Sequence, residues 1–351
     1  MQQVLFHLPD WLPWVGGVPV YGYGVMLVLG FFASLQLGKF LGRRSGIDPE
    51  VFVNAGLIAL VTGVIGARLS HVLENLEVYT DSSRSAWENL KAAANIRSGG
   101  LTFYGGFLLA TPCTIAYGLI RRVPIRLGMD IVAPCVMVGL AFGRIGCLLN
   151  GCCYGAECHL PPPLSVQFPY HSNPYTDQFR NGTLKELPPP EAVHVVRGEP
   201  VPMSTEDIAR NPTLSPERRS EVLAEVRSLD SNPLHPAQLY STITALLVAA
   251  VLVACFTLPH VPGRVFALML MIEAPSRFVL EMLRSEPPFV GPDSDPLRLT
   301  FLPNMSFSMV LSVGLLLAGV VLWFVFGRMG GRVGGGEEAQ PAGSAARAAT
   351  A

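Results

Sequence analysis

An arginine lies inside an apolar run near the middle of the chain, in the segment 142–155, which reads FGRIGCLLNGCCYG. Placing an arginine in hydrocarbon costs roughly 2.5 to 3.5 kcal/mol on insertion scales. Arg144 should therefore face a protein interior or a polar cavity and meet an anion there. A guanidinium group donates bidentate hydrogen bonds to phosphate oxygens, so a phosphate is the anion that this residue type favours.

A second group of charges lies in the apolar run 265–283 and just after it. At about 100° per residue, its members fall within an arc of roughly 80° on one helix. They are Glu273, Arg277, Glu281 and Arg284. A salt-bridge ladder between residues four apart is expected for one of the two carboxylates. With Arg68 and Arg144 included, the arginines outnumber the glutamates, which leaves positive charge for a phosphate.

The composition indicates a membrane protein with several spans. Half of the 351 residues are hydrophobic and only 15% are charged. The net charge of −1 gives no basis for nucleic-acid binding. The seven cysteines have no regular spacing, which excludes the disulfide framework of small secreted domains. No cofactor is expected.

Apolar runs of about 20 residues predict an all-α polytopic bundle of about seven transmembrane helices. The expected spans are 21–41, 51–73, 99–120, 129–150, 239–258, 265–283 and 305–326. Lysine and arginine gather in the short loops on one side of these spans, for example at Arg43, Arg121 and Arg264. The positive-inside rule therefore places the N-terminus outside and the C-terminus in the cytoplasm.

Four segments are expected along the chain. Residues 1–150 carry the first four spans, 151–234 form a polar, proline-rich extracytoplasmic head, 235–328 carry the last three spans, and 329–351 form a disordered cytoplasmic tail. Within the head, Ser215 followed by proline predicts a helix start, with the helix running to about Ser228.

This topology brings polar side chains of five spans to one level, in the outer leaflet near its headgroups. Arg144 is expected roughly 9 Å below the outer end of its span, Arg277 at a similar depth, and Tyr104 near roughly 8 Å. Tyr23, Arg68 and His71 are expected at the same end of their spans.

Two glycine pairs flank Tyr104 in the segment 98–106, SGGLTFYGG. Gly105 and Gly106 are typical of close helix packing in membrane bundles. Gly99 and Gly100 stand at a helix start, where free backbone amides can face an anion. Both interpretations can hold together. Gly151 predicts the turn that ends the fourth span.

The cysteine cluster after the fourth span has competing interpretations. Cys152, Cys153, Cys158 and His159 suggest zinc, but they lack the usual paired spacing and no second ligand pair is present. Packing or an external disulfide is therefore favoured, and no metal site is expected. A nucleophilic Cys152, with its thiol pKa lowered from about 8.5 by Arg144, is the stronger rival.

Residues 143–155 resemble the signature GRxGNFxNxExxG of the prolipoprotein diacylglyceryl transferase family, matching its glycines, its arginine and its second asparagine. Further similarities are Tyr23-Gly24, the two glycine pairs, HPAQLY from His235 and RFVLEMLR from Arg277. The resemblance covers nearly the whole chain.

The resemblance implies an enzyme of the bacterial inner membrane that transfers the diacylglyceryl group of phosphatidylglycerol to the lipobox cysteine of prolipoproteins, releasing glycerol phosphate. It implies catalytic roles for Arg144, Arg277 and Tyr104. It also implies a substrate-binding set: Tyr23, Gly99, Gly100, Gly143, Asn150, Cys152, Gly155, His235, Tyr240, Glu281 and Arg284.

Three departures from the family pattern leave the general base open. Tyr104 stands where the family commonly has histidine, and Cys147 and Cys152 replace the signature's first asparagine and its glutamate. A phenol with a pKa near about 10 is a poor base at neutral pH. His235, His71 or a Cys152 thiolate could serve, or a cationic site could lower the acceptor's own pKa.

Two further functions remain open on the same fold. One is an enzyme that forms a covalent lipid intermediate on Cys152. The other is a membrane protein without enzymatic activity, which binds anionic lipid or uses its cysteines for redox chemistry or metal binding.

Overall fold

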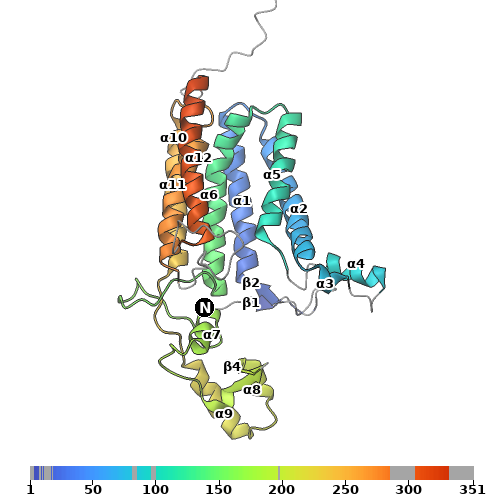
Figure 1. Ribbon diagram of the computed structural model, residues 1–351, viewed down its shortest axis with the longest axis vertical. Coiled ribbons are helices and arrows are strands. Elements are labelled where there is room, and N and C mark those ends of the chain that lie inside the picture. The colour runs from blue at the N-terminus through green and yellow to red at the C-terminus, as the bar shows by residue number, and fades with distance from the viewer. Residues whose placement is uncertain are drawn as a thin grey trace, which may run out of the picture. The chain divides into compact units, whose positions relative to one another are not determined.

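The computed structural model describes residues 4–7, 9, 11, 17, 19–80, 85–95, 100–196, 198–284 and 305–331. Most of these residues are helical (Figure 1). The long helices are α1 (Gly22–Arg44), α2 (Pro49–Glu74), α5 (Phe103–Ile120), α6 (Ile125–Asn150), α10 (Ala237–Thr257), α11 (Arg264–Met282) and α12 (Phe307–Met329). The short ones are α3 (Leu76–Tyr79), α4 (Ala86–Ala94), α7 (Asn173–Arg180), α8 (Thr205–Arg210), α9 (Pro216–Arg227) and the 3₁₀ turn η2 (Pro190–Ala192).

The seven long helices coincide with the seven expected spans, and five of them are long and apolar enough to cross a membrane: α1, α2, α6, α10 and α12. Helix α5 has a shorter apolar stretch, and α11 carries a charged stripe. The count of seven spans therefore remains a prediction.

The expected start of the third span at residue 99 is wrong, because α5 begins at Phe103. Gly100 has a φ of +78°, a left-handed conformation that does not continue a right-handed helix. The chain therefore enters α5 three residues after this glycine.

The mostly helical fold also includes two small antiparallel hairpins, which the sequence did not predict. Strand β1 (Val4–His7) pairs with β2 (Pro19–Tyr21), and β3 (Val193–Val196) pairs with β4 (Glu199–Pro202). Strand β3 is rich in valine, which favours extended backbone, and Gly198 supplies a φ of +88° between the strands.

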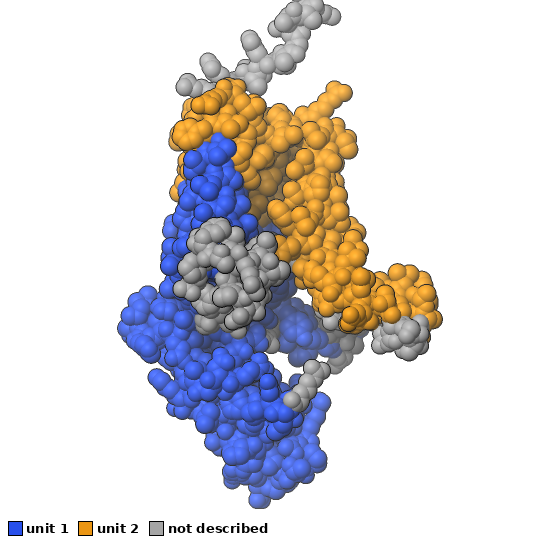
Figure 2. Space-filling model, in the orientation of Figure 1, with its two compact units in different colours: residues 1–32, 137–250, 269–321 blue, residues 33–136, 251–268, 322–351 orange. Residues whose placement is uncertain are grey.

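The chain forms two compact units (Figure 2). Unit 1 comprises residues 1–32, 137–250 and 269–321, and unit 2 comprises residues 33–136, 251–268 and 322–351. The boundaries fall inside long helices, so they do not coincide with the four segments expected along the chain. That division into segments remains a prediction, and the expected tail lies outside the described residues beyond Gly331.

Within unit 1, the segment after α6 is tied to the ends of two other helices. Gly155 donates its backbone N–H to the carbonyl of His235 at 3.0 Å, just before α10, and Ala156 donates to Leu283 at 2.7 Å, just after α11. The start of α1 reaches the same place, since a Cβ on Gly22 would lie 3.0 Å from Leu149 of α6. These contacts gather four helix ends of alternating chain direction.

Residues 151–234 of unit 1 build a hydrophobic core of their own. It includes Tyr170, Tyr175, Ile208, Val222 and Val226, all buried. The predicted helix is confirmed as α9: the Ser215 hydroxyl accepts the backbone N–H of Arg218 at 3.2 Å, and Ser228 caps the other end.

In unit 2, helices α2 and α5 pack closely along small residues. A Cβ on Gly105 would lie 2.2 Å from the Cβ of Ser70, and one on Gly106 would lie 2.9 Å from the carbonyl oxygen of Gly63. No larger side chain fits at these positions, which confirms the packing interpretation of this glycine pair.

Candidate functional site

The charged stripe on α11 and just after it forms a compact ion-pair group in unit 1. The Glu281 oxygen Oε2 lies 3.3 Å from Arg277 Nη2 and 3.4 Å from Arg284 Nη1. The Glu281 side chain is 2% exposed, whereas those of Arg277 and Arg284 are 30% and 25% exposed. The expected salt-bridge ladder is thus confirmed for Glu281. Glu273 accepts a hydrogen bond from Ser276 on its own helix instead, at 3.2 Å.

Arg277 is also held from a neighbouring helix, because its Nε donates to the Ser308 hydroxyl of α12 at 3.2 Å. The charge of Arg144, on α6, acts on both Arg277 and Glu273. Among the described residues, these three arginines outnumber the two glutamates by one formal positive charge, before any charge on the nearby cysteines is counted. Such a group can bind an anion such as a phosphate.

Arg68, which the sequence predicts in the same cationic layer, has main-chain partners in its own unit. It lies in unit 2, is 6% exposed, and donates to the carbonyls of Ala93 at 2.7 Å, Ala92 at 2.9 Å and Gly100 at 3.0 Å. Its guanidinium also lies over the Tyr79 ring, 5.3 Å from the ring centroid. These hydrogen bonds use three of its five N–H donors, so Arg68 ties backbone segments together, and its part in a phosphate site remains a prediction.

The glycine loop before α5 packs against the end of α2. A Cβ on Gly100 would lie 2.3 Å from His71 Nε2, and the carbonyl of Gly100 accepts from Arg68. Gly99, the other predicted binding glycine, lies outside the described residues. Tyr104 lies in the first turn of α5, in unit 2, and is 54% exposed.

Three thiols meet where α6 ends. The sulfur atoms of Cys147, Cys152 and Cys153 all lie within 4.8 Å of one another. Cys158, which the sequence grouped with Cys152 and Cys153, is buried apart from them and directs its sulfur at the carbonyl of Leu164, 3.6 Å away. The structure therefore groups Cys152 and Cys153 with Cys147 of α6, and not with Cys158 as expected.

The pKa values of the two cysteines beyond the helix diverge. Hydrogen bonds from the Cys147 and Cys152 thiols, with the charges of Arg144 and Arg284, lower the pKa of Cys153. The hydrogen bond with Cys147 lowers the pKa of Cys152, but the one with Cys153 and burial raise it above its ordinary value. The expected Cys152 thiolate is thus not supported, because the hydrogen bonds among the three thiols favour the charge on Cys153.

The remaining predicted residues of α1 and α6 lie along α6 or pack against it. Tyr23 packs on α6, since a Cβ on Gly146 would lie 2.9 Å from its ring, and it is 39% exposed. Gly143 faces open space, because no atom lies within 4 Å of a Cβ built there. Asn150 is the last residue of α6, and Gly151 follows with a φ of +69°, which confirms the predicted turn.

The predicted residues around α10 have mainly structural contacts. A Cβ on Gly155 would lie 2.6 Å from the Cβ of His235, so Gly155 serves close backbone packing. The Tyr240 hydroxyl donates to the carbonyl of Leu164 at 3.1 Å. The His235 Nδ1 is buried and has no hydrogen-bond partner among the described residues.

Sequence reasoning missed two positioning residues. Gln238 is fully buried and donates its amide N–H to the carbonyl of Cys152 at 2.8 Å. Ser308 holds Arg277, as described above. The signal was available for both, because each is a polar residue in or beside an apolar run, where an unpartnered polar group is costly.

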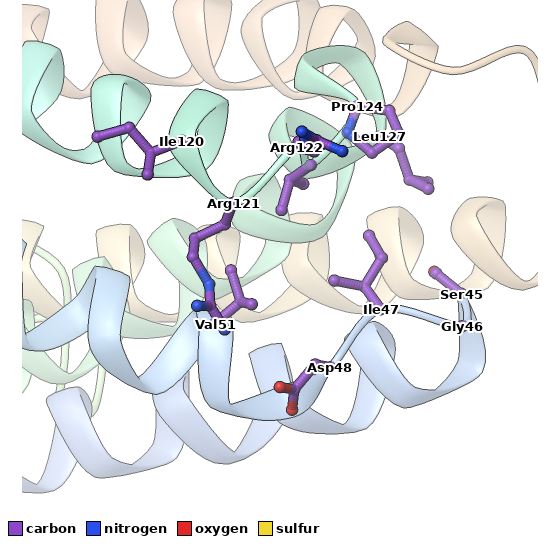
Figure 3. A pocket seen from close by; sticks show the side chains of 11 residues that line it. Ser45, Gly46, Ile47, Asp48, Val51, Ile120, Arg121, Arg122, Pro124 and Leu127 are labelled. Carbon is purple, nitrogen blue, oxygen red and sulfur yellow. The ribbon is translucent and has the colours of Figure 1, made fainter.

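The described residues line two cavities, of which only one lies beside the predicted site residues. One of about 450 Å³ opens beside the cysteines and is lined by Cys152, Cys153, Tyr154, His171, Asn173, Thr176, Asp177 and Arg180. The other, of about 580 Å³, lies in unit 2 beside the loops at Gly46 and Arg122 (Figure 3). It contains none of the predicted site residues.

Comparison with known proteins adds to this geometry. A family model described as prolipoprotein diacylglyceryl transferase matches residues 11–325. A protein of Rhodopirellula baltica named phosphatidylglycerol–prolipoprotein diacylglyceryl transferase is 39% identical over 170 residues, which are 48% of this chain and 34% of that protein. Proteins of the same name from Corynebacterium diphtheriae and Clostridium tetani are 28% and 25% identical, covering 78% and 82% of this chain and 80% and 87% of their own lengths.

Proposed function

We propose a reaction for this chain from one premise: it belongs to the prolipoprotein diacylglyceryl transferase family, whose model matches residues 11–325. The chain is a transferase of lipoprotein maturation in the bacterial inner membrane. It moves the diacylglyceryl group of phosphatidylglycerol to the thiol of a lipobox cysteine in a prolipoprotein, as the names of its relatives describe for donor and acceptor.

The arginines of unit 1 hold the donor's phosphate. One observation carries this assignment: Arg277 is fixed by Glu281 and Ser308, and the charge of Arg144 acts on it from a second helix. Arg144 and Arg277 bind the phosphate, while Arg284 and Glu281 keep the cationic group in position. Positive groups set at the point where charge develops account for about 10²- to 10³-fold in rate per donor.

The reaction exchanges one bond for another at a glyceryl carbon. The acceptor sulfur forms a bond to that carbon, the bond from the carbon to the phosphate oxygen breaks, and glycerol phosphate leaves with the electron pair. The leaving phosphate gains negative charge in this step, and the guanidinium groups of Arg144 and Arg277 beside it lower the barrier.

The other predicted residues keep supporting roles. The residues of unit 1 that line the substrate-binding site are Tyr23, Gly143, Asn150, Cys152 and Tyr240. Gly155 and His235 hold the segment after α6 against the start of α10. For Tyr104, Gly99 and Gly100, the assignment rests on the motif alone.

The finer topology belongs to the same proposal. Seven helices cross the membrane, residues 151–234 form a head on the extracytoplasmic side, the N-terminus is outside and the C-terminus is in the cytoplasm. The distribution of Lys and Arg in the loops supports this orientation. It brings the cationic group to the depth of the donor's headgroup, where the acceptor cysteine arrives from outside.

Transfer to a lipobox peptide in membranes that contain phosphatidylglycerol tests the function. Wild type should yield a thioether-linked lipid on the cysteine, and Arg144→Ala should lower the rate at least about 100-fold. Arg121→Ala is the matched control, because this exposed arginine lies in the loop between α5 and α6, and it should keep the wild-type rate. No product from wild type, where a family relative gives product under the same conditions, would overturn the proposal in favour of a lipid-binding protein.

A further inference from the structure

The thiols of Cys147, Cys152 and Cys153 lie close enough together to bind one metal ion. Their sulfur atoms lie within 4.8 Å of one another, and all three residues are only half-buried. In a tetrahedral zinc site with bonds of about 2.3 Å, the sulfurs of two ligands are about 3.8 Å apart. Small rotations of the side chains therefore convert this cluster into three corners of a zinc tetrahedron.

The backbone after α6 is shaped to bring these sulfurs together. Gly151 turns the chain with a φ of +69°, and Cys153 also has a positive φ, of 59°, which is uncommon for a residue with a side chain. The Cys152 N–H returns to the carbonyl of Cys147 at 3.0 Å. Gln238 then fixes the loop from α10 through the Cys152 carbonyl.

A metal uses this arrangement more completely than a disulfide does. A disulfide joins two sulfurs at about 2.0 Å and leaves the third without a role. A soft cation such as Zn²⁺ takes all three thiolates and retains one open coordination position, as catalytic zinc sites do. Three thiolates and Zn²⁺ carry one net negative charge. The positive charges of Arg144 and Arg284, which act on Cys153, balance it.

The open position has access from outside the cluster. The cavity of about 450 Å³ is lined by Cys152 and Cys153 and extends to His171 and Arg180. A peptide side chain that enters this cavity reaches the sulfurs directly. The cavity and the cluster both belong to unit 1.

We propose that Cys147, Cys152 and Cys153 bind one Zn²⁺ whose fourth coordination position takes the acceptor cysteine of the prolipoprotein. This inference rests on the proposed function and supplies the activation that Tyr104 is poorly suited to give. A thiol that coordinates zinc is bound as the thiolate.

The step balances without a change of oxidation state. The acceptor thiol displaces water from zinc and releases its proton to solvent. Its sulfur then forms the bond to the glyceryl carbon as the bond to the phosphate oxygen breaks. Glycerol phosphate leaves with the electron pair beside Arg144 and Arg277, and the thioether product, a weaker ligand than a thiolate, leaves the zinc.

Zinc content measured by mass spectrometry on the purified full-length protein tests the site without reference to activity. Wild type incubated with Zn²⁺ and passed through a desalting column should retain one zinc per chain. Replacing any one ligand, as in Cys147→Ser, Cys152→Ser or Cys153→Ser, should weaken zinc binding more than about 100-fold. Loss of a ligand should reduce metal affinity more than loss of a residue that only supports a ligand, which costs up to about 100-fold. Cys158→Ser is the matched control and should retain zinc, because its sulfur lies outside the cluster.

Cobalt replacing zinc tests the role of the fourth position. Co²⁺-loaded protein should show thiolate-to-cobalt absorption, and a lipobox peptide should shift the visible bands toward those of a four-thiolate site. The same peptide with serine in place of cysteine should leave the spectrum unchanged. A spectrum that the cysteine peptide does not change would overturn the proposed role of the metal.

Activity separates failure of this inference from failure of the proposed function. Removal of the metal should abolish transfer, and Zn²⁺ should restore it, whereas Arg144→Ala should lose transfer but keep its zinc. Full transfer by metal-free wild type, a zinc content unchanged by Cys152→Ser, or a disulfide between two of the three cysteines in the active protein would overturn the zinc site and leave the transferase intact. A spectral shift with the peptide but no transfer by wild type would overturn the function and leave the site.

Discussion

Arg277 and Glu281 form an ion pair across one turn of α11, with Arg277 Nη2 3.3 Å from Glu281 Oε2. The carboxylate is almost fully buried, whereas the arginine side chain is 30% exposed. Burial of the carboxylate carries a desolvation cost that offsets the attraction, so the ion pair adds little net stability. Its main effect is on orientation, because Glu281 and Ser308 together hold the guanidinium from two sides.

Glu281→Gln should lower kcat for diacylglyceryl transfer about tenfold, which corresponds to about 1.4 kcal/mol of transition-state stabilisation. The amide keeps the shape of the side chain but removes the charge that orients both arginines. KM for phosphatidylglycerol should change less than about twofold, because the positive charge that attracts the lipid remains. Glu273→Gln should cause a smaller loss, since Glu273 hydrogen-bonds to Ser276 of its own helix. A wild-type kcat with a lowered melting temperature would instead assign Glu281 a purely structural role.

Gly100→Ala should destabilise the protein by about 1–3 kcal/mol, measured as a lower melting temperature in detergent. Alanine is strained at a φ of +78°, and its Cβ would lie 2.3 Å from His71 Nε2. Gly118→Ala in α5 is the matched control: nothing lies within 4 Å of its Cβ, so it should be neutral or stabilising by about 0.5–1 kcal/mol. Equal melting temperatures for the two variants would contradict this role for Gly100.

Local patterns were sufficient to predict the helices and one of the ion pairs. A serine before a proline indicates a helix start through hydrogen bonding within one turn, and α9 begins where Ser215 predicts. The pairing of Arg277 with Glu281 follows from spacing on a single helix. The packing of Gly105 against α2 follows from the preference of close helix pairs for small residues.

Features set by tertiary contacts were not predictable from such patterns. Arg68 binds carbonyls 24 to 32 residues away in the chain, so no local spacing reveals these partners. The grouping of Cys147 with Cys152 depends on a turn with positive φ at Gly151 and Cys153. Because the sequence pattern shows only that a turn exists, the thiol cluster became visible only in the structure.

Protein stability should fall as pH rises above about 6.5 because of His260, in the loop between α10 and α11. Burial alone lowers the pKa of His260, but hydrogen bonding to Asp130 and Leu258 and the Asp130 charge raise it above its ordinary value. Nε2 lies 3.5 Å from Asp130 Oδ2. A histidine with a raised folded pKa contributes stability that is fully present below its unfolded pKa, about 6.5, and is lost as pH rises through the folded value.

Melting temperatures of wild type and His260→Gln across this pH range check the prediction. The variant should lose this pH dependence and match wild type best at high pH, where the wild-type imidazole is neutral. Asp130 also accepts the backbone N–H groups of Gly263 at 2.6 Å and Phe266 at 2.8 Å. Asp130→Asn should therefore destabilise at every pH, which distinguishes loss of these caps from loss of the histidine charge. A pH dependence retained in His260→Gln would assign it to another group.

Cysteines introduced on the two sides should report the orientation of the chain. Ser228→Cys is exposed at the end of α9 in the head, and Glu50→Cys is exposed at the start of α2, in a loop expected to be cytoplasmic. A membrane-impermeant maleimide applied to intact spheroplasts should modify position 228 and leave position 50 unmodified, as peptide mapping by mass spectrometry would show. After lysis both positions should react, which controls for accessibility. The arginine group lies at the same helix ends as the head. If only position 50 were labelled in intact spheroplasts, the arginine group would lie in the cytoplasmic leaflet, where it could not meet a secreted acceptor cysteine. That outcome would contradict the proposed reaction.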